Sequence, residues 1–200
     1  MLMRFIALIV LLISFPAFGA STEAVYGSNG MVASRSTLAS EAGIEIMRRG
    51  GNAVDAAVAT AFALAVTYPS AGNLGGGGFA VVRLQSGEVV TLDHREKAPA
   101  AAYRDMFLDE NGEVDNHLAR STLLSSGVPG SVDGLITLLQ RYGTLSLPQV
   151  IAPAIKLARD GFEIDWYVAR HFAWVRPKMI KHAASIAKFS VAGRPPKQGD

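Results

Sequence analysis

The sequence predicts an α+β fold that is rich in helix. Residues 53–66 are apolar at almost every position, as in a helix that is buried on all sides. Two short runs rich in β-forming residues follow at 79–84 and 88–93, and Gln85-Ser86-Gly87 between them indicates a hairpin. After residue 130 the apolar residues return at helical spacing. Helical stretches on both sides of one strand pair define this class.

Residues 1–19 have the three parts of an export signal. Arg4 supplies the positive start, residues 5–13 are apolar, and Ala17-Phe18-Gly19 is a small-x-small cleavage pattern. The apolar run is shorter than the roughly 20 residues of a membrane span, so cleavage is favoured over a retained anchor. We expect the mature chain to begin at Ala20 and to be periplasmic or secreted.

The composition limits the classes of function. The chain contains no cysteine, so an exported protein of this sequence depends on its core and not on disulfides. The formal net charge is +2, or +1 without Arg4, and the basic residues are scattered, which argues against a nucleic-acid partner. No metal site or cofactor is predicted, because the histidines lack ligand spacing. They are His94, His117, His171 and His182.

The chain before the hairpin is expected to begin with a short strand and a helix. Residues 30–34 are the strand candidate. Ser36 or Thr37 is placed to cap the helix, whose apolar residues repeat at helical spacing. Arg48 and Arg49 fall in its last turn, where cations suit the helix dipole.

Gly50 and Gly51 separate this helix from the apolar one, and the two are expected to form an αα pair. Asn52 is placed to cap the apolar helix, with Asp55 near its positive end. Pro69 stops the helix. Its length and its acid favour a place in the core over a membrane span.

The sequence GNLGGGGF at residues 72–79 has two explanations. A phosphate-binding loop runs strand, glycines, helix, so that the helix N-terminus faces the anion. Here the glycines follow a helix and lead into a strand, and Phe79 stands where such a loop has lysine. The alternative is a tight passage in which the backbone needs positive φ or close approach to another segment. The order of the elements favours the tight passage.

The second strand runs into Asp93-His94-Arg95-Glu96-Lys97. Five polar or charged residues at a strand end form either a functional cluster or a solvated turn with neutralising neighbours. Residue type alone favours the solvated turn. His94 alone is more typical of packing or hydrogen bonding than of catalysis.

The remainder of the chain is expected to be helical after a looser stretch. Residues 109–113 indicate an exposed turn. Ser131 is placed to cap a helix that ends at Tyr142. It does not fit the Gly-x-Ser-x-Gly motif of a serine nucleophile, because no strand precedes it and no glycine stands two residues after it. Further helices are expected at residues 147–160, 165–172 and 178–188. An aromatic group more typical of a core than of a cofactor site comprises Trp166, Tyr167, Phe172 and Trp174.

Several motifs, in this order, resemble the gamma-glutamyltranspeptidase family. They are LASEAG at 38–43, GGNAVDAA at 50–57, GNLGGGGF at 72–79, REKAP at 95–99, GVPGSV at 127–132 and APAIKLA at 152–158. The resemblance covers about residues 30–162. An ordered set of this kind is far more specific than any single motif.

The resemblance implies an N-terminal nucleophile hydrolase with a four-layer αββα sandwich. Family members are made as one precursor that cuts itself into a large and a small subunit. The new N-terminal threonine of the small subunit attacks the gamma-glutamyl amide of glutathione, and water or an amino acid or peptide acceptor resolves the acyl-enzyme. No threonine of this sequence lies in the family's nucleophile motif. Residues 20–200 are therefore expected to be the first portion of a large subunit within a longer reading frame. The nucleophile is expected beyond Asp200.

The resemblance assigns one substrate-binding residue, Arg95 of the REKAP motif. In the family this arginine holds the α-carboxylate of the gamma-glutamyl group, and a planar guanidinium grips a carboxylate with two hydrogen bonds. Glu96 and Lys97 are expected to orient or neutralise it, and the glycine run receives no catalytic role. Three alternatives stay open: a related cephalosporin acylase or capsule-processing transpeptidase, an inactive exported fragment, and a nucleotide-binding module built on the glycine run.

Overall fold

The computed structural model describes residues 24–200, so the export signal and the cleavage before Ala20 lie outside the described residues and stay predictions. Within the described part, helices pack together with one two-stranded sheet at their edge, which confirms the helix-rich α+β prediction. No helix in this part is both long and apolar enough to cross a membrane. The elements are α2 (Thr37–Arg48), α3 (Ala53–Thr67), β1 (Phe79–Arg83), β2 (Val89–Asp93), α4 (Asn116–Ser121), the 3-10 helix η1 (Leu123–Ser125), α5 (Ser131–Tyr142), α6 (Leu147–Asp160), α7 (Trp166–Met179) and α8 (Ala183–Lys188).

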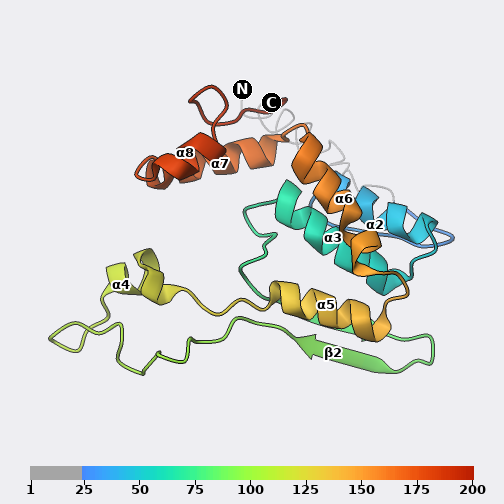
Figure 1. Cartoon of the computed structure of the whole chain (residues 1–200), viewed down its shortest axis with the longest axis horizontal. Helices are drawn as coiled ribbons and strands as arrows, with labels where there is room; N and C mark the ends of the chain where they lie inside the picture. Colours follow the sequence, from blue (N-terminus) through green and yellow to red (C-terminus); the bar gives the residue numbers. More distant parts are fainter. Residues whose placement is uncertain (1–23) are drawn as a thin grey trace, which may run out of the picture.

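Helix α3 lies at the centre of the molecule, with α2, α5 and α6 packed around it (Figure 1). Its alanines let the neighbouring helices approach closely, and Val58, Ala59 and Ala63 have no exposed surface. The predicted burial on all sides is nevertheless wrong for one face. Ala57 is exposed and Leu64 is half-buried, because no described element covers that side. The largest buried apolar side chains of the surrounding helices are Ile46, Leu135, Leu138, Leu139 and Val150.

The start of α3 is fixed by a reciprocal cap, as the sequence predicts. The Asn52 side-chain oxygen accepts from the amides of Val54 and Asp55 at 2.8 and 3.1 Å. The Asp55 carboxylate in turn accepts from the Asn52 amide at 2.8 Å. The Asn52 side-chain amide also donates to the carbonyl of Tyr142 at 2.7 Å, which ties this cap to the end of α5.

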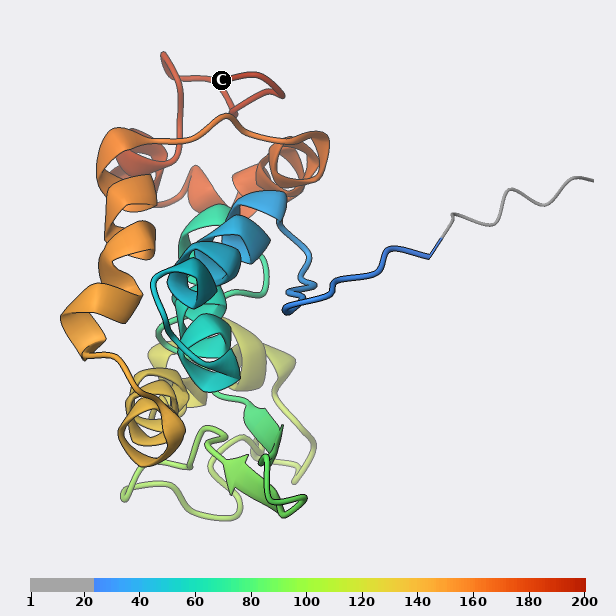
Figure 2. The same cartoon turned by 90° about the vertical axis from the view of Figure 1, so that its right-hand side faces the viewer.

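Strands β1 and β2 form an antiparallel hairpin in the predicted place. The register pairs Phe79 with Asp93 and Arg83 with Val89. Ala80, Val82 and Leu92 are half-buried against the core, so one face of the hairpin lies on the helices. Figure 2 shows the hairpin beneath α5 and the first described residues running out from the body.

Residues 30–34 do not form the predicted strand. A strand needs a hydrogen-bonded neighbour, and no segment of residues 24–200 pairs with them. They line a shared cavity with the small-residue face of α3 instead, where Val32 approaches Gly43 of α2.

The start of α5 differs from the prediction. Gly130, not Ser131, is the N-cap, and no side chain caps this end. Ser131 is the first helical residue, and its hydroxyl donates to Asn73 Oδ1 at 2.5 Å. The amides of Gly130 and Ser131 donate to the carbonyl of Gly76 at 2.8 and 2.9 Å, so the glycine run takes the place of a capping side chain.

The C-terminal helices also divide differently. Helix α7 does not end at Phe172 but continues to Met179, with Pro177 in its last turn. Helix α8 begins only at Ala183. Trp166 and Trp174 are 57% and 71% exposed, so the aromatic group is not a core cluster. Members of the group contact rings outside it, such as Phe172 with Phe189 at 5.7 Å between ring centroids.

Candidate functional site

Arg95 lies just past the end of β2, on backbone that is held on both sides. The hairpin ladder continues one pair beyond its strands, since His94 donates to the Gly78 carbonyl at 3.0 Å and Gly78 donates back at 3.3 Å. Beyond Arg95, Lys97 and Val128 exchange two backbone hydrogen bonds of 3.1 and 2.8 Å. The charged stretch is therefore a hydrogen-bonded crossing between the hairpin and the segment before α5, and its residues Arg95, Glu96 and Lys97 are exposed, in line with the solvated character that residue type alone favours.

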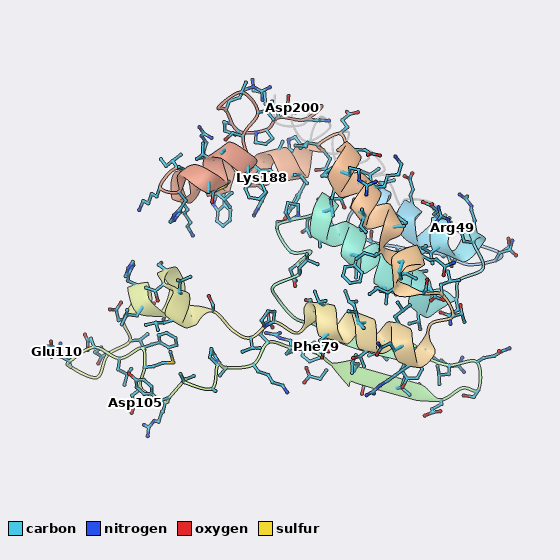
Figure 3. All side chains as sticks on the ribbon, viewed as in Figure 1. Arg49, Phe79, Asp105, Glu110, Lys188 and Asp200 are labelled. Carbon is cyan, nitrogen blue, oxygen red and sulfur yellow. The ribbon has the colours of Figure 1, made fainter. Side chains whose placement is uncertain are left out.

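The Arg95 side chain points out from this crossing and is 59% exposed. Its Nε donates to Glu96 Oε2 at 3.0 Å, and its guanidinium carbon lies 5.6 Å from the centre of the Phe79 ring. Figure 3 labels Phe79 at the end of the hairpin beside the start of α5. Because Arg95 Nε donates to Glu96, the two terminal nitrogens of Arg95 stay available for bidentate hydrogen bonding to a carboxylate.

Glu96 is held in its ionised form. Its own backbone amide is the largest cause that lowers the pKa of the Glu96 carboxyl, and the charge and hydrogen bond of Arg95 lower it further against the opposing effect of burial. An ionised Glu96 accepts from Arg95 and donates nothing, so it orients the guanidinium while offsetting part of its charge. This arrangement agrees with the expectation that Glu96 orients or neutralises Arg95.

A pocket of about 390 Å³ lies beside Arg95. One wall is the crossing itself, with Arg95, Glu96 and Lys97. The other wall comes from residues 98–126, an arm that runs away from the helical body and carries Asp105 and Glu110 near its far end (Figure 3). The arm supplies the hydroxyl-bearing Ser125 and Ser126, and an apolar surface from Met106, Phe107 and Leu124. Two cations, one carboxylate and two serines make this a polar site suited to an anionic small molecule.

The arm residues of this pocket could not be singled out from the sequence. In the sequence, Ser125 and Ser126 lie in a stretch rich in serine, glycine and proline. Met106 and Phe107 lie in a stretch for which no regular structure is predicted. No spacing rule connects them with Arg95, because the arm leaves and returns over residues 98–126, in which only α4 and η1 are regular. The bridge between Lys97 and Val128 is what brings the two walls together.

The glycine run is a tight passage and not a phosphate loop. Its amides are used within the protein: Gly76 donates to Asn73 Oδ1 at 2.8 Å and Gly78 donates to His94. None of the glycines from Gly72 to Gly78 has positive φ. Close approach is the reason for glycine, since a Cβ on Gly72 would overlap the carbonyl of Leu64 at the end of α3.

Several hydroxyls of the chain are committed to structure. Thr60 and Thr67 donate to carbonyls one turn earlier in α3 at 2.8 and 3.0 Å. Thr144 donates to Asp55, and Ser131 donates to Asn73. In the described residues no group of three or more histidine, aspartate or glutamate side chains is placed to hold a metal ion.

Comparison with known proteins agrees with this geometry. The family profile described as gamma-glutamyltranspeptidase matches residues 39–200. The glutathione hydrolase proenzyme of Escherichia coli K12 is 47% identical over 177 residues, which are 88% of this chain and 30% of that protein. The chain therefore spans about a third of the length of that relative.

Solved structures match the fold as well. The crystal structure of Helicobacter pylori gamma-glutamyltranspeptidase has a TM-score of 0.84 at 45% identity, covering 88% of this chain and 51% of that one. A cephalosporin acylase from Bacillus halodurans has a TM-score of 0.77 at 28% identity, covering 94% of this chain and 35% of that one. These matches place the fold among the N-terminal nucleophile hydrolases, as part of their αββα sandwich. Within that class, the chain belongs to the gamma-glutamyltranspeptidase family.

Proposed function

We propose that the complete protein transfers and hydrolyses the gamma-glutamyl group of glutathione and related compounds through a threonine acyl-enzyme. Family membership over residues 39–200 supports the reaction class. We place the nucleophilic threonine in the part of the relatives' length that this chain does not cover. Residues 24–200 would then supply substrate binding and not the attacking group.

Arg95 is the proposed binding residue for the α-carboxylate of the donor. The observation that supports this role is an exposed arginine side chain whose Nε donates to Glu96 and which lines a pocket of charged, hydroxyl and apolar residues. A carboxylate fits the two terminal guanidinium nitrogens side by side, whereas lysine would offer only a point charge.

The expected partners follow from the same family. The Escherichia coli relative is named a proenzyme, which supports a precursor cut into a large subunit containing this chain and a small subunit containing the threonine. Amino acids, peptides or water would act as acceptors. Residues 1–19 support export to the periplasm or the medium, and sequencing the N-terminus of the secreted protein should give Ala20 first.

A related acylase or capsule-processing transpeptidase is the second candidate, because the cephalosporin acylase shares the fold. Arg95 favours an acyl group that carries an α-carboxylate. Two anilide substrates distinguish these candidates: a gamma-glutamyl anilide should be cleaved faster than a glutaryl anilide, which keeps the carboxylate but lacks the α-amino group.

The decisive experiment changes Arg95 in the complete protein. Arg95→Ala should raise KM for gamma-glutamyl donors at least about tenfold, and Arg95→Lys should raise it less, because one charge remains without the planar pair of donors. Arg104→Ala is the matched control, since Arg104 is an exposed arginine of the arm that pairs with Asp105. Wild-type KM in both Arg95 variants would show that the carboxylate is bound elsewhere.

A change in the substrate sharpens the same test. A donor whose α-carboxylate is masked as an amide should bind wild-type protein and Arg95→Ala equally weakly. If Arg95→Ala weakens the masked donor as much as the free acid, the arginine acts on another part of the substrate or on the fold.

A further inference from the structure

The backbone on both sides of Arg95 is packed against glycines from two separate segments. From the glycine run, a Cβ on Gly77 would lie 2.7 Å from Arg95 Cα and 2.7 Å from the Glu96 amide nitrogen. From the start of α5, a Cβ on Gly130 would overlap the His94 carbonyl and lie 3.0 Å from that of Arg95. The Gly77 distances and the overlap of Gly130 with the His94 carbonyl are shorter than real Cβ contacts allow, so neither position has room for a side chain.

The need for glycine here is a matter of space and not of backbone conformation. Neither Gly77 nor Gly130 has positive φ, unlike Gly87 in the hairpin turn. Gly75, in the same run, has no heavy atom within 4 Å of the place its Cβ would take. Gly75 is therefore an uncrowded position within the run, whereas Gly77 is crowded by the crossing.

His94 fills the space on the other side of the crossing. Its ring lies between two glycines, since a Cβ on Gly134 of α5 would overlap the His94 ring and one on Gly78 would lie 2.9 Å from its Cε1. Its Nδ1 is buried and has no hydrogen-bond partner in the described residues. The ring thus contributes its shape to this contact rather than a hydrogen bond through Nδ1.

Hydrogen bonds also hold the backbone around Arg95. Residues 78 and 94 exchange two backbone bonds, and Gly76 accepts from the first amides of α5. The Arg95 amide donates to Asp93 Oδ1 at 3.0 Å. What stays free is the Arg95 side chain, directed outward beside its pocket.

We propose that Gly77 and His94 are positioning residues that hold the Arg95 peptide so that its guanidinium meets the donor carboxylate without rearrangement. A binding group that is already fixed loses little freedom when the ligand arrives, and this raises affinity without a new contact. Displacement of that group by a fraction of an ångström removes the advantage. The inference rests on the proposed role of Arg95.

The test compares Gly77→Ala with Gly75→Ala in the complete protein. Both substitutions add the same methyl group to the same run, but only the first meets Arg95. Gly77→Ala should raise the donor KM about tenfold while kcat stays within about twofold, because binding that is equal in ground and transition states acts on KM. Gly75→Ala should keep both constants. Equal effects of the two variants, or an unchanged KM in Gly77→Ala, would overturn the proposal.

The ring of His94 provides an independent variant should Gly77→Ala fail to fold. His94→Ala should raise KM, and His94→Phe should restore it, because phenylalanine keeps a flat ring and the buried Nδ1 has no partner to lose. A KM that rises equally in both variants would contradict a role through shape. The melting temperature should not follow KM across the three variants if their effect is on position.

A double-mutant cycle separates this inference from the proposed function. If Gly77 acts through Arg95, Gly77→Ala should leave KM unchanged in an Arg95→Ala background. A further tenfold rise there would overturn the positioning role and leave the role of Arg95 intact. If Arg95→Ala alone has no effect on KM, the proposed role of Arg95 fails first.

Discussion

The carboxylate of Asp55, in the first turn of α3, binds Thr144 from the loop between α5 and α6. The Thr144 hydroxyl donates to Asp55 Oδ2 at 2.7 Å, and its amide donates to Oδ1 at 3.0 Å. The Leu145 amide adds a bond of 3.1 Å, and Asp55 has no exposed surface. One buried acid thus joins the cap of the central helix to the turn that sets the path of α6.

Replacement of Asp55 should strongly destabilise the fold. Asp55→Ala leaves several buried donors without an acceptor, so we expect a loss of about 3 kcal/mol in the free energy of unfolding. Asp105→Asn, which alters an exposed acid of the arm, is the control and should stay within about 0.5 kcal/mol. Urea unfolding at neutral pH measures both. A loss below about 1 kcal/mol would show that water replaces the carboxylate.

The same carboxylate predicts how stability depends on pH. Burial raises the pKa of Asp55, but hydrogen bonds from Thr144, Leu145 and Asn52 together outweigh it and hold the pKa below the ordinary 3.8. The unfolded chain therefore takes up the proton more readily than the folded one. The stability that ionised Asp55 contributes is present above pH 3.8 and is lost as pH falls below that value. Melting curves from pH 6 to 2 should show a shallower decline in Asp55→Asn than in the wild-type protein.

Asn52→Ala should cost more than an isolated cap. An N-cap asparagine contributes on the order of 1 kcal/mol, and Asn52 also bonds the Tyr142 carbonyl, so we expect about 1.5–2 kcal/mol. Asp115→Ala removes the cap of α4 on the arm, which makes few contacts with the helical body, and it should leave the main melting transition unchanged. An unchanged melting curve for Asn52→Ala would refute the cap.

Gly134→Ala sets helix propensity against packing. Alanine in place of glycine inside α5 should stabilise the helix by about 1 kcal/mol. The added methyl group overlaps His94, however, and overpacking of this kind costs about 1–3 kcal/mol. We expect a net loss in the wild-type background and a smaller loss in His94→Ala, which removes the ring but keeps a Cβ 2.4 Å from the added methyl group. A gain in both backgrounds would show that His94 moves away freely.

The Tyr68 and Tyr167 hydroxyls should titrate as a pair. They lie 3.3 Å apart, and the guanidinium of Arg35 lies 4.3 Å from the Tyr167 ring centre. The hydrogen bond between the two hydroxyls lowers the pKa of Tyr68 and raises the pKa of Tyr167. Absorbance at alkaline pH should therefore show one step below and one above pH 10. Tyr167→Phe should remove the upper step and shift the lower one toward pH 10.

Much of the local structure follows from the sequence. Helix α3 begins at its predicted cap, because Asn52 and Asp55 act within one turn of each other. The hairpin lies where β-forming residues flank a turn with Gly87 at positive φ. The family motifs singled out Arg95, and its role stays a prediction until the variants are measured.

The errors arise where contacts over long distances decide. Residues 30–34 have strand-forming side chains but no partner in the described chain, and Ser131 has a capping side chain but turns it toward Asn73. Trp166 and Trp174 are exposed because α7 packs through its other side, with Val168 buried. Composition gives no sign of which face a helix will present.

The sequence by itself determined the central helix, the hairpin and the family, and it singled out Arg95 as the residue expected to bind a donor carboxylate, since caps, turns and motifs are short-range features of neighbouring residues. Only the tertiary structure shows why glycine is required at residues 77 and 130. Gly77 and Gly130 are far apart in the chain and both pack against the backbone of residues 94–96, where van der Waals exclusion leaves no room for a Cβ. That exclusion is a property of three segments packed together, and no single segment carries it.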